Sequence, residues 1–441
     1  MKTVCVLLLL VVGCAQEENL GNTPFQDHAT WSLALGGRGY ERGTAVAVDS
    51  VGDVIVGGDG YKGTIDFGDG PVGNVGIWAF IAKRNGTTGA PIWERSITGR
   101  EEGATVDLTD IALASDGSLY VTGQYMGTVD FGGITLVTQV PRNGDMFVAK
   151  YTADGSLLWV AGLGTLSDAY AQGLSVDGFD NVYVDGSYHL GTFTLLGTTY
   201  TSADNQVGFV VSYSRDGTPR WIHSFDPTAT TLVSGIATSP TGDVVFAGQF
   251  TSPLSFGGEI VQPGAPQQGF LARYRADGSY VWARAIGAAD DVRRVTVDPD
   301  DRIVVETFFA EGSVDHQQAL ATFGPDGDTK SNYALPLSTT GHAVTADKTL
   351  VSSQWVDSDS GAGHLELTSI GFTGEVATSE VGERLSPPGG ATVVRDIAIG
   401  PSGELAVVGD LAGEILVGPT AITAHGTNDT DALVILIPPT N

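Results

Sequence analysis

The feature that most constrains the fold is an internal repeat of roughly sixty residues. In each copy, a strand of alternating apolar residues is followed by a turn, a second strand, a long connection, a third strand led by an aromatic or aliphatic residue, and a hairpin to a fourth strand. Self-similarity at a fixed period indicates supersecondary units that bury their apolar faces against one another. The innermost strands of the copies begin at Val46, Ile111, Leu174, Ile236, Val295, Val344 and Ile397.

The hairpin between the third and fourth strands carries the clearest local signal. A glycine occupies it in six copies, and in four of them Asp precedes the glycine, a dipeptide preferred in tight hairpins. These glycines are Gly89, Gly155, Gly217, Gly278, Gly327 and Gly374. A tryptophan lies four residues after each of the first four, at Trp93, Trp159, Trp221 and Trp282. We therefore expect Trp on the outer strands, where a large ring can cover the gap between neighbouring units.

The two ends of the chain share one unit of the repeat. The sequence has seven third strands but only six hairpin glycines after them, and the missing fourth strand has its match at Thr30–Gly37, which contains Trp31. A solenoid would instead show capping repeats at its ends. We therefore predict an all-β fold for residues 28–441: a seven-bladed β-propeller of four-stranded blades, closed by the N-terminal strand pairing with the C-terminal blade.

The repeat resembles the seven-bladed β-propeller (SBBP-type) repeat proteins of bacterial envelopes. The residues that carry the resemblance are Gly127–Gly133, Phe147–Tyr151 and Asp154–Trp159, with weaker matches in the fifth and sixth copies. The resemblance spans residues 30–437 and implies a secreted or surface propeller, often lipid-anchored. It implies no catalytic residues, because the shared motif is structural.

The first residues have the pattern of an export signal. Lys2 precedes an apolar run over Val4–Val12, which is too short for a membrane-spanning helix, and Gly13-Cys14 follows. This segment resembles a bacterial lipoprotein signal, which implies cleavage of residues 1–13, lipid attachment at Cys14, and a polar tether over 14–27. Ala15 after the cysteine favours the outer membrane. The alternative is an ordinary signal cut elsewhere, with Cys14 incidental.

Composition excludes several classes of function. With 51 acidic and 22 basic residues, the chain has a net charge of −29, which disfavours binding to nucleic acid. Its two cysteines lie in the first fourteen residues, so the predicted propeller has neither a disulfide nor a thiol nucleophile. Seven dispersed histidines show no zinc-binding spacing, and no nucleophile elbow or Walker loop is present. Gly68–Gly73 fits the G-x-G-x-x-G pattern, but Pro71 and the absence of a helical pattern after it argue against a phosphate site. We expect no catalytic residue, no metal and no cofactor.

A set of polar residues immediately precedes the predicted innermost strands. Chain direction would place them together near one mouth of the central channel, where a ligand could bind. The alternative is a solvated rim, since loop ends facing water are polar in any case. The set comprises Asp110, Gln172, Arg293, Arg294, His342, Arg395 and Asp396.

The leading functional hypothesis is a monomeric, lipid-anchored propeller of the outer membrane, on its periplasmic face or at the cell surface. It would act without catalysis as a module that binds or scaffolds a protein or glycan, since rigid scaffolds with variable connections carry function in their loops. Its partners would be the membrane, through the lipid, and an unknown protein or glycan. The alternative is a propeller enzyme, a lyase or hydrolase acting on glycans, with its site at the channel mouth.

Overall fold

The computed structural model describes most of the chain and consists of strands joined by turns, with no helix among the described residues. These residues are 29–66, 71–164, 168–287, 291–308, 318–335, 339–344, 349–357, 363–371, 376–384, 393–417, 420–425 and 429–439. The signal, Cys14 and the tether predicted from the sequence lie outside them. The prediction of an all-β fold is confirmed for the described part of the chain.

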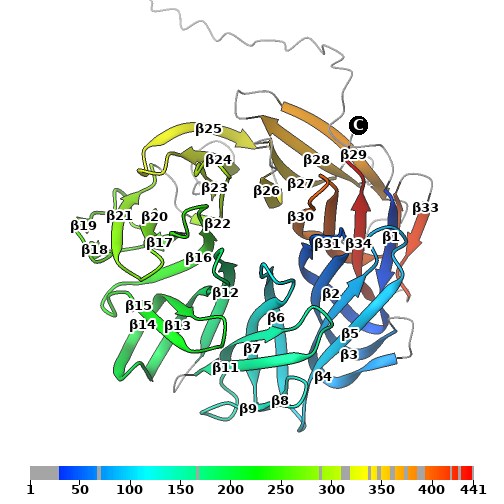
Figure 1. Ribbon diagram of the computed structural model, residues 1–441, viewed down its shortest axis with the longest axis horizontal. Coiled ribbons are helices and arrows are strands. Elements are labelled where there is room, and N and C mark those ends of the chain that lie inside the picture. The colour runs from blue at the N-terminus through cyan, green and yellow to red at the C-terminus, as the bar shows by residue number, and fades with distance from the viewer. Residues whose placement is uncertain are drawn as a thin grey trace, which may run out of the picture.

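The strands fall into antiparallel groups of four, arranged around a common centre (Figure 1). The first group is β2 (Gly37–Val48), β3 (Val54–Asp66), β4 (Pro71–Arg84) and β5 (Pro91–Gly99). The second is β6 (Thr105–Leu113), β7 (Leu119–Met126), β10 (Asp145–Tyr151) and β11 (Leu157–Leu163). The third is β12 (Ala169–Val176), β13 (Val182–Leu195), β14 (Thr198–Tyr213) and β15 (Pro219–Ser224). The fourth is β16 (Thr231–Thr238), β17 (Val244–Phe250), β20 (Gln268–Tyr274) and β21 (Tyr280–Ala285).

The remaining groups follow the same order. The fifth is β22 (Asp291–Val297), β23 (Ile303–Phe308), β24 (Gln318–Phe323) and β25 (Thr329–Leu335). The sixth is β26 (Thr339–Val344), β27 (Thr349–Asp357), β28 (Gly363–Gly371) and β29 (Val376–Arg384). The last combines β30 (Val393–Ile399), β31 (Leu405–Ala412) and β34 (Thr430–Ile437) with β1 (Trp31–Leu35). Small outer hairpins are β8 (Thr128–Asp130) with β9 (Thr135–Val137), β18 (Leu254–Ser255) with β19 (Ile260–Val261), and β32 (Glu414–Val417) with β33 (Thr420–Thr423).

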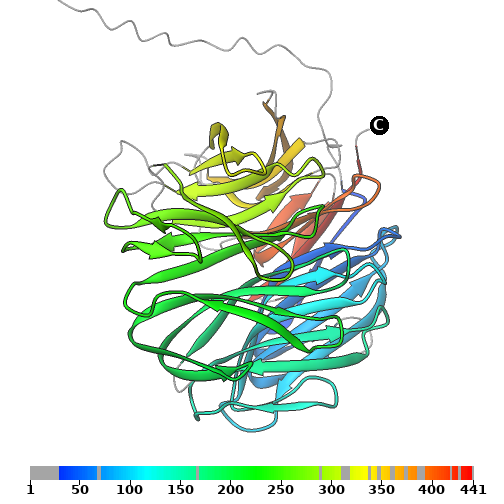
Figure 2. The same ribbon diagram turned by 60° about the vertical axis from the view of Figure 1, so that its left-hand side comes forward.

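The first strand belongs to the last group. β1 pairs antiparallel with β34, from Trp31 opposite Leu436 to Leu35 opposite Ala432, and the two lie side by side in Figure 1. The innermost strands contact their neighbours in chain order, β2 with β6, β6 with β12, and onward to β26 with β30, and β30 also contacts β2. Among the described residues no sheet closes on itself, and neighbouring groups pack face against face (Figure 2). Strand pairing also joins neighbouring groups in places, since β2 pairs with β34 at Tyr40 and Thr430, and β29 pairs with β32.

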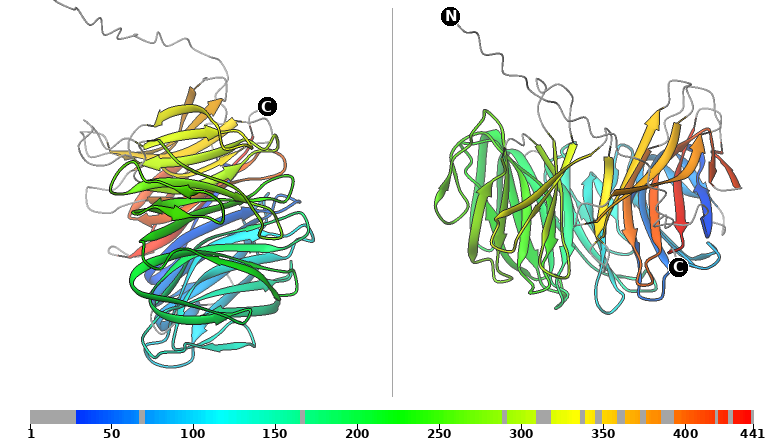
Figure 3. Two further views of the ribbon diagram at one scale, coloured as in Figure 1. Left: turned by 90° about the vertical axis from the view of Figure 1, so that its left-hand side faces the viewer. Right: turned by 90° about the horizontal axis from the view of Figure 1, so that it is seen from above.

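The apolar core lies between neighbouring groups of strands. One cluster joins Tyr120 and Val148 of the second group to Val184 and Phe209 of the third, and other clusters fill other interfaces in the same way. Viewed from above, neighbouring groups stand face to face around the centre (Figure 3). The sheets between these clusters therefore bury both faces, which explains why the third strands β10, β20 and β24 are buried at every residue.

On the outer side, a repeated contact of tryptophan with glycine joins each of five groups to the next. The Trp221 ring lies against Gly278 of the next hairpin, where an added Cβ would be 2.9 Å from Trp221 Cγ, and its indole Nε1 donates to Ala276 O at 3.0 Å. Gly278 has a φ of +85°, which favours glycine. The same arrangement links Trp31 to Gly89, Trp93 to Gly155, Trp159 to Gly217 and Trp282 to Gly327. The prediction that Trp covers the gap between units is confirmed at these five positions.

Candidate functional site

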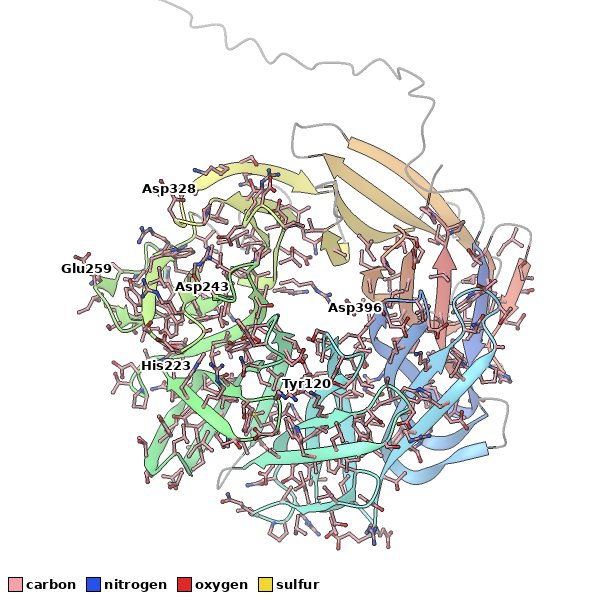
Figure 4. All side chains as sticks on the ribbon, in the orientation of Figure 1. Tyr120, His223, Asp243, Glu259, Asp328 and Asp396 are labelled. Atoms are coloured by element: carbon pink, nitrogen blue, oxygen red, sulfur yellow. The ribbon has the colours of Figure 1, made fainter. Side chains whose placement is uncertain are left out.

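A cavity of about 440 Å³ lies at the centre, where the innermost strands meet. Residues of β2, β6, β12, β16, β22, β26 and β30 line it, so strands far apart in the sequence share one wall. Asp396 lies at the edge of the central space in Figure 4, whereas Glu259 lies at the outer margin. Because its wall is polar and drawn from many strands, the cavity is the natural candidate for a binding site.

A β-bulge at the same place in each innermost strand shapes the cavity wall. The pairing register shifts by one residue between the innermost strand and its neighbour, for example between Ala171 and Gly173 of β12. A bulge leaves the extra residue outside the ladder and changes the direction of its side chain. The extra residues are all polar: Thr44, Thr109, Gln172, Ser234, Arg293, Thr340 and Arg395. Of these, Thr44, Thr109, Gln172, Ser234 and Arg293 line the cavity.

Two of the predicted site residues, Asp110 and Asp396, join neighbouring groups. Asp110 Oδ2 accepts a hydrogen bond from Leu174 N of the third group at 2.8 Å, and its Oδ1 accepts one from Ile111 N. Asp396 Oδ2 accepts one from Val46 N of the first group at 3.0 Å. Both follow a bulge directly, so the same backbone device lets a carboxylate satisfy an amide of the adjacent group.

Arg294 joins two groups that are not adjacent. Its guanidinium forms an ion pair with Asp396, and its Nη2 donates to Arg395 O at 3.2 Å. Since β22 carries Arg294 and β30 carries Asp396, the side chain reaches past the sixth group, whose innermost strand is β26. Burial by itself would lower the pKa of Arg294, but the charge and hydrogen bond of Asp396, together with the charges of Glu306 and Asp110, outweigh burial and raise the pKa above its ordinary value. The arginine therefore stays charged and ties the fifth group to the last one.

The contacts of Gln172 and Arg293 differ from those of Asp110, Asp396 and Arg294, which join groups of strands. Gln172 is exposed, lines the cavity, and forms no side-chain hydrogen bond within the described residues. The Arg293 side chain is 61% exposed and its Nε donates to Asp291 at 3.2 Å. Between them along the wall lies Ser234, whose hydroxyl donates to Val292 O. These three residues place an amide, a hydroxyl and a guanidinium on consecutive innermost strands.

A buried carboxyl group, that of Asp185, lies behind this wall and next to Asp110 of the wall itself. Asp185 of β13 is fully buried, and no described residue donates a hydrogen bond of regular geometry to either of its oxygens. Burial raises its pKa well above the ordinary value, and the charge of Asp110 adds to the effect. Burial, followed by the charge of Asp396, raises the pKa of Asp110 to about 7. The two groups meet near Gly173, whose added Cβ would be 3.0 Å from Asp185 Oδ1 and 3.5 Å from Asp110 Oδ2.

The structure corrects where the predicted residues lie. They are inside the innermost strands, along the channel wall, because those strands begin earlier than the alternation of apolar residues predicts. A bulge interrupts that alternation, so the pattern resumes only after it. Asp110, Gln172, Arg293, Arg294 and Asp396 share the cavity. Arg395 instead binds Asp410, with Nη2–Oδ2 at 2.5 Å. His342 lies in β26 opposite Ser352, and its side chain lies outside the described part.

Sequence reasoning missed several contributors to the site. Thr44, Thr109 and Ser234 occupy the same bulge position as Gln172, and aligning the copies on the second residue before each predicted strand would have found them. Asp185 carries no local signal, because only the pairing of β13 with β12 brings it behind Gly173. Among the described residues, no group of three or more His, Cys, Asp or Glu side chains is arranged to hold a metal ion. No helix in the described ranges has the length and apolar character to span a membrane.

Comparison with known proteins identifies the fold class. The Pan2 WD40 domain of Neurospora crassa superposes with a TM-score of 0.50 at 10% identity, over 91% of this chain and 90% of that one. An ulvan lyase of polysaccharide lyase family PL25 also gives 0.50, at 11% identity, over 93% of this chain and 97% of that one. The chain is a β-propeller repeat protein.

Sequence similarity is more limited. An uncharacterized WD repeat-containing protein (L264) of Acanthamoeba polyphaga mimivirus is 23% identical over 215 aligned residues, covering 42% of this chain. The chain covers only 15% of that relative's length. No family model matches the chain.

Proposed function

We propose that this chain is a seven-bladed, lipid-anchored β-propeller that binds a protein or glycan at its central cavity. The contacts of β30 with β2 and the pairing of β1 with β34 support seven blades closed by the N-terminal strand. The contact of Trp31 with Gly89 supports the same closure, because it repeats the contact that Trp221 makes with Gly278.

One observation carries the binding proposal: equivalent bulges place different polar groups on the wall of a single cavity. Gln172, Ser234 and Arg293 hold the same position in successive repeats, yet they supply an amide, a hydroxyl and a guanidinium. A purely structural channel would need only side chains that satisfy the backbone, as Asp110 does. Convergent polar groups with spare hydrogen-bonding capacity are what a ligand site requires.

Filling the cavity tests this proposal. Gln172→Trp would place a large ring in the cavity, while Leu158→Trp adds the same ring at an exposed position of β11. We expect the full chain to retain a protein or glycan from envelope extracts, and Gln172→Trp to lose it while Leu158→Trp keeps it. Retention by both variants would exclude the cavity as the site.

The proposed anchor is a lipid on Cys14, supported by the lipoprotein-like pattern around it. A diacylated or triacylated cysteine gives the stable membrane attachment that one acyl chain cannot. We expect Cys14→Ala to release the protein from the membrane fraction. Protease treatment of intact cells, with an epitope tag at the C-terminus, then distinguishes the cell surface, where the tag is lost, from the periplasmic face, where it is protected.

A propeller enzyme acting on glycans is the second candidate, and one observation favours it. Asp110, with its pKa raised to about 7 by burial, shares the cavity with Asp396 and Arg294. Carboxyl groups in different protonation states are the usual acid–base equipment of glycan-cleaving enzymes. Incubation with polysaccharides, followed by reducing-end measurement, would show turnover that Asp110→Asn abolishes. No turnover with any acidic or neutral polysaccharide would leave the binding role.

A further inference from the structure

We propose that the ligand of the central cavity is an acidic saccharide, with its carboxylate bound by Arg293 and its hydroxyls bound by Ser234 and Gln172. The inference rests on the proposed binding function and names the ligand class. It follows from the order of chemical groups along three consecutive innermost strands, β12, β16 and β22.

The bulges give these three side chains a common position. In each strand the residue left outside the ladder is the one that reaches the cavity, at Gln172, Ser234 and Arg293. The neighbouring innermost strands contact each other, β12 with β16 and β16 with β22. The row therefore offers an extended ligand an amide, then a hydroxyl, then a guanidinium.

The hydrogen-bonding capacity of the row matches sugar hydroxyls. A sugar hydroxyl both donates and accepts, and the Gln172 amide can do the same because it forms no hydrogen bond within the described residues. The Ser234 hydroxyl donates to Val292 O and still has lone pairs to accept from a ligand. An apolar ligand would cover these polar groups without pairing them, which costs binding free energy.

The guanidinium selects for a negative charge. The Arg293 side chain is 61% exposed, and its guanidinium has partners within the chain, Asp291 at 3.2 Å among them. The contact with Asp291 joins two partly exposed side chains, an arrangement of small net strength. Guanidinium pairs well with carboxylate in a bidentate geometry, so a ligand carboxylate can compete at this position. A cationic ligand would meet both Arg293 and Arg294.

The acidic side chains around the cavity repel an anionic ligand less strongly than their number suggests. Asp396 is paired with Arg294, and both oxygens of Asp110 accept backbone N–H groups. Burial raises the pKa of Asp110 to about 7 and that of Asp185 well above its ordinary value, so both carboxyls carry less negative charge near neutral pH than an exposed aspartate would. The net charge of −29 belongs to the whole chain and is screened over about 8 Å at physiological ionic strength.

Calorimetric titration of the full chain in 0.15 M salt tests the inference with three probes. The first is a glucuronate-containing tetrasaccharide, the second is the same tetrasaccharide with its carboxylates reduced to alcohols, and the third is a tetraglutamate peptide. We expect the acidic tetrasaccharide to bind, and the reduced form to bind at least about tenfold more weakly, as expected for loss of a charged hydrogen bond.

Matched variants locate the binding. We expect Arg293→Gln to weaken binding of the acidic tetrasaccharide about tenfold or more and to abolish its preference over the reduced form. Gln172→Ala should weaken both saccharides. Arg100→Gln is the control, because Arg100 is an exposed arginine paired with Asp130 outside the cavity. It should bind like the parent chain.

Other results separate this inference from the proposed function. Equal binding of acidic and reduced tetrasaccharides, or binding unaffected by Arg293→Gln, would overturn the acidic-saccharide inference and leave a glycan site in place. Binding of the peptide alone would also overturn it, and would leave a protein-binding propeller. If no saccharide binds and Gln172→Trp also leaves retention from envelope extracts unchanged, then both the inference and the cavity proposal fail.

Discussion

The outer hairpins and the channel wall both recur from one group of strands to the next, but the hairpins share side chains whereas the wall shares only a backbone feature. At the outer hairpins the side chains recur: a Trp ring packs on a hairpin glycine and its indole donates to a carbonyl of the next group at five positions. At the channel wall only the backbone recurs, as a bulge in each innermost strand, while the side chains differ. The contact at the outer hairpins requires side chains of one shape, so the same residue types, Trp and Gly, recur there. The bulge in each innermost strand sets only the direction in which a side chain points, so the chemical group of that side chain can differ from strand to strand.

The largest effect should come from removing one outer tryptophan. Trp221 is 9% exposed and packs on Gly278, so Trp221→Ala removes a buried ring and a hydrogen bond between two groups. We expect the free energy of unfolding to fall by about 3–5 kcal/mol. Chemical denaturation measures this, with Gln172→Ala as the channel-wall control, expected to change it by less than about 0.5 kcal/mol. A similar loss of unfolding free energy in Trp221→Ala and Gln172→Ala would contradict this difference between the outer hairpins and the channel wall.

Substitutions at two glycines distinguish the cost of backbone strain at a positive φ from the cost of displacing the Trp ring. Gly278 and Gly242 have φ values of +85° and +84°, but only Gly278 has a neighbour close enough for an added Cβ to touch, at 2.9 Å. Gly242→Ala should cost about 1 kcal/mol from backbone strain alone. Gly278→Ala should cost about 2–4 kcal/mol, because the methyl group also displaces the Trp221 ring. Equal melting temperatures for the two variants would show that the ring contact contributes little.

The channel wall should make stability depend on pH. The pKa of Asp110 is raised to about 7 and that of Asp185 is raised well above its ordinary value, both mainly by burial. Between about pH 4 and 7 the folded chain therefore holds protons that the unfolded chain releases. The free energy of unfolding falls as pH rises, by up to about 1.4 kcal/mol per pH unit for each such group.

Asp185→Asn sharpens that prediction. The amide has nearly the same shape and no titration, so the variant should lose less stability than the parent chain as pH rises from 5 to 7. Denaturation at several pH values measures the two slopes. Glu41, whose pKa burial raises to about 7, keeps a residual slope in the variant. Identical slopes in the two proteins would mean that Asp185 does not titrate in this range.

The smallest effect is expected at Arg293. Its side chain is 61% exposed and contacts Asp291 on its own strand, so Arg293→Gln should change the free energy of unfolding by less than about 0.5 kcal/mol. Thermal melting measures this, and a much larger loss would assign Arg293 a structural role like that of Arg294. Unchanged stability together with altered saccharide binding would distinguish a residue that binds ligand from one that, like Arg294, joins groups of strands.

The sequence allowed much of the fold to be predicted because its signals are local. The Asp-Gly hairpins and the Trp four residues later need only a few neighbouring residues to be recognised, and Gly278 with Trp282 shows the pattern. The candidate site was predicted less well. Gln172, Arg293 and Asp396 were recognised as polar residues beside innermost strands, but the bulge that places them inside those strands breaks the alternation on which strand prediction depends.

Other parts of the site could not be predicted because they depend on contacts between distant segments. The ion pair of Arg294 with Asp396 joins residues 102 positions apart in the chain. The orphaned carboxyl of Asp185 depends on the absence of a side chain at Gly173, which faces it across the sheet. Neither relation has a period or spacing that a single sequence would reveal.

The pairing of β1 with β34 has a consequence for how the molecule assembles. It joins residues about four hundred positions apart, and bringing the ends of so long a loop together costs about 5 kcal/mol in chain entropy. The last sheet gains its edge strand only after most of the remaining chain has been ordered, so this pairing should be among the late steps of folding. A circularly permuted chain, with β1 joined directly behind β34 and new ends in the hairpin between β8 and β9, would make that pairing local and should fold faster to the same native structure.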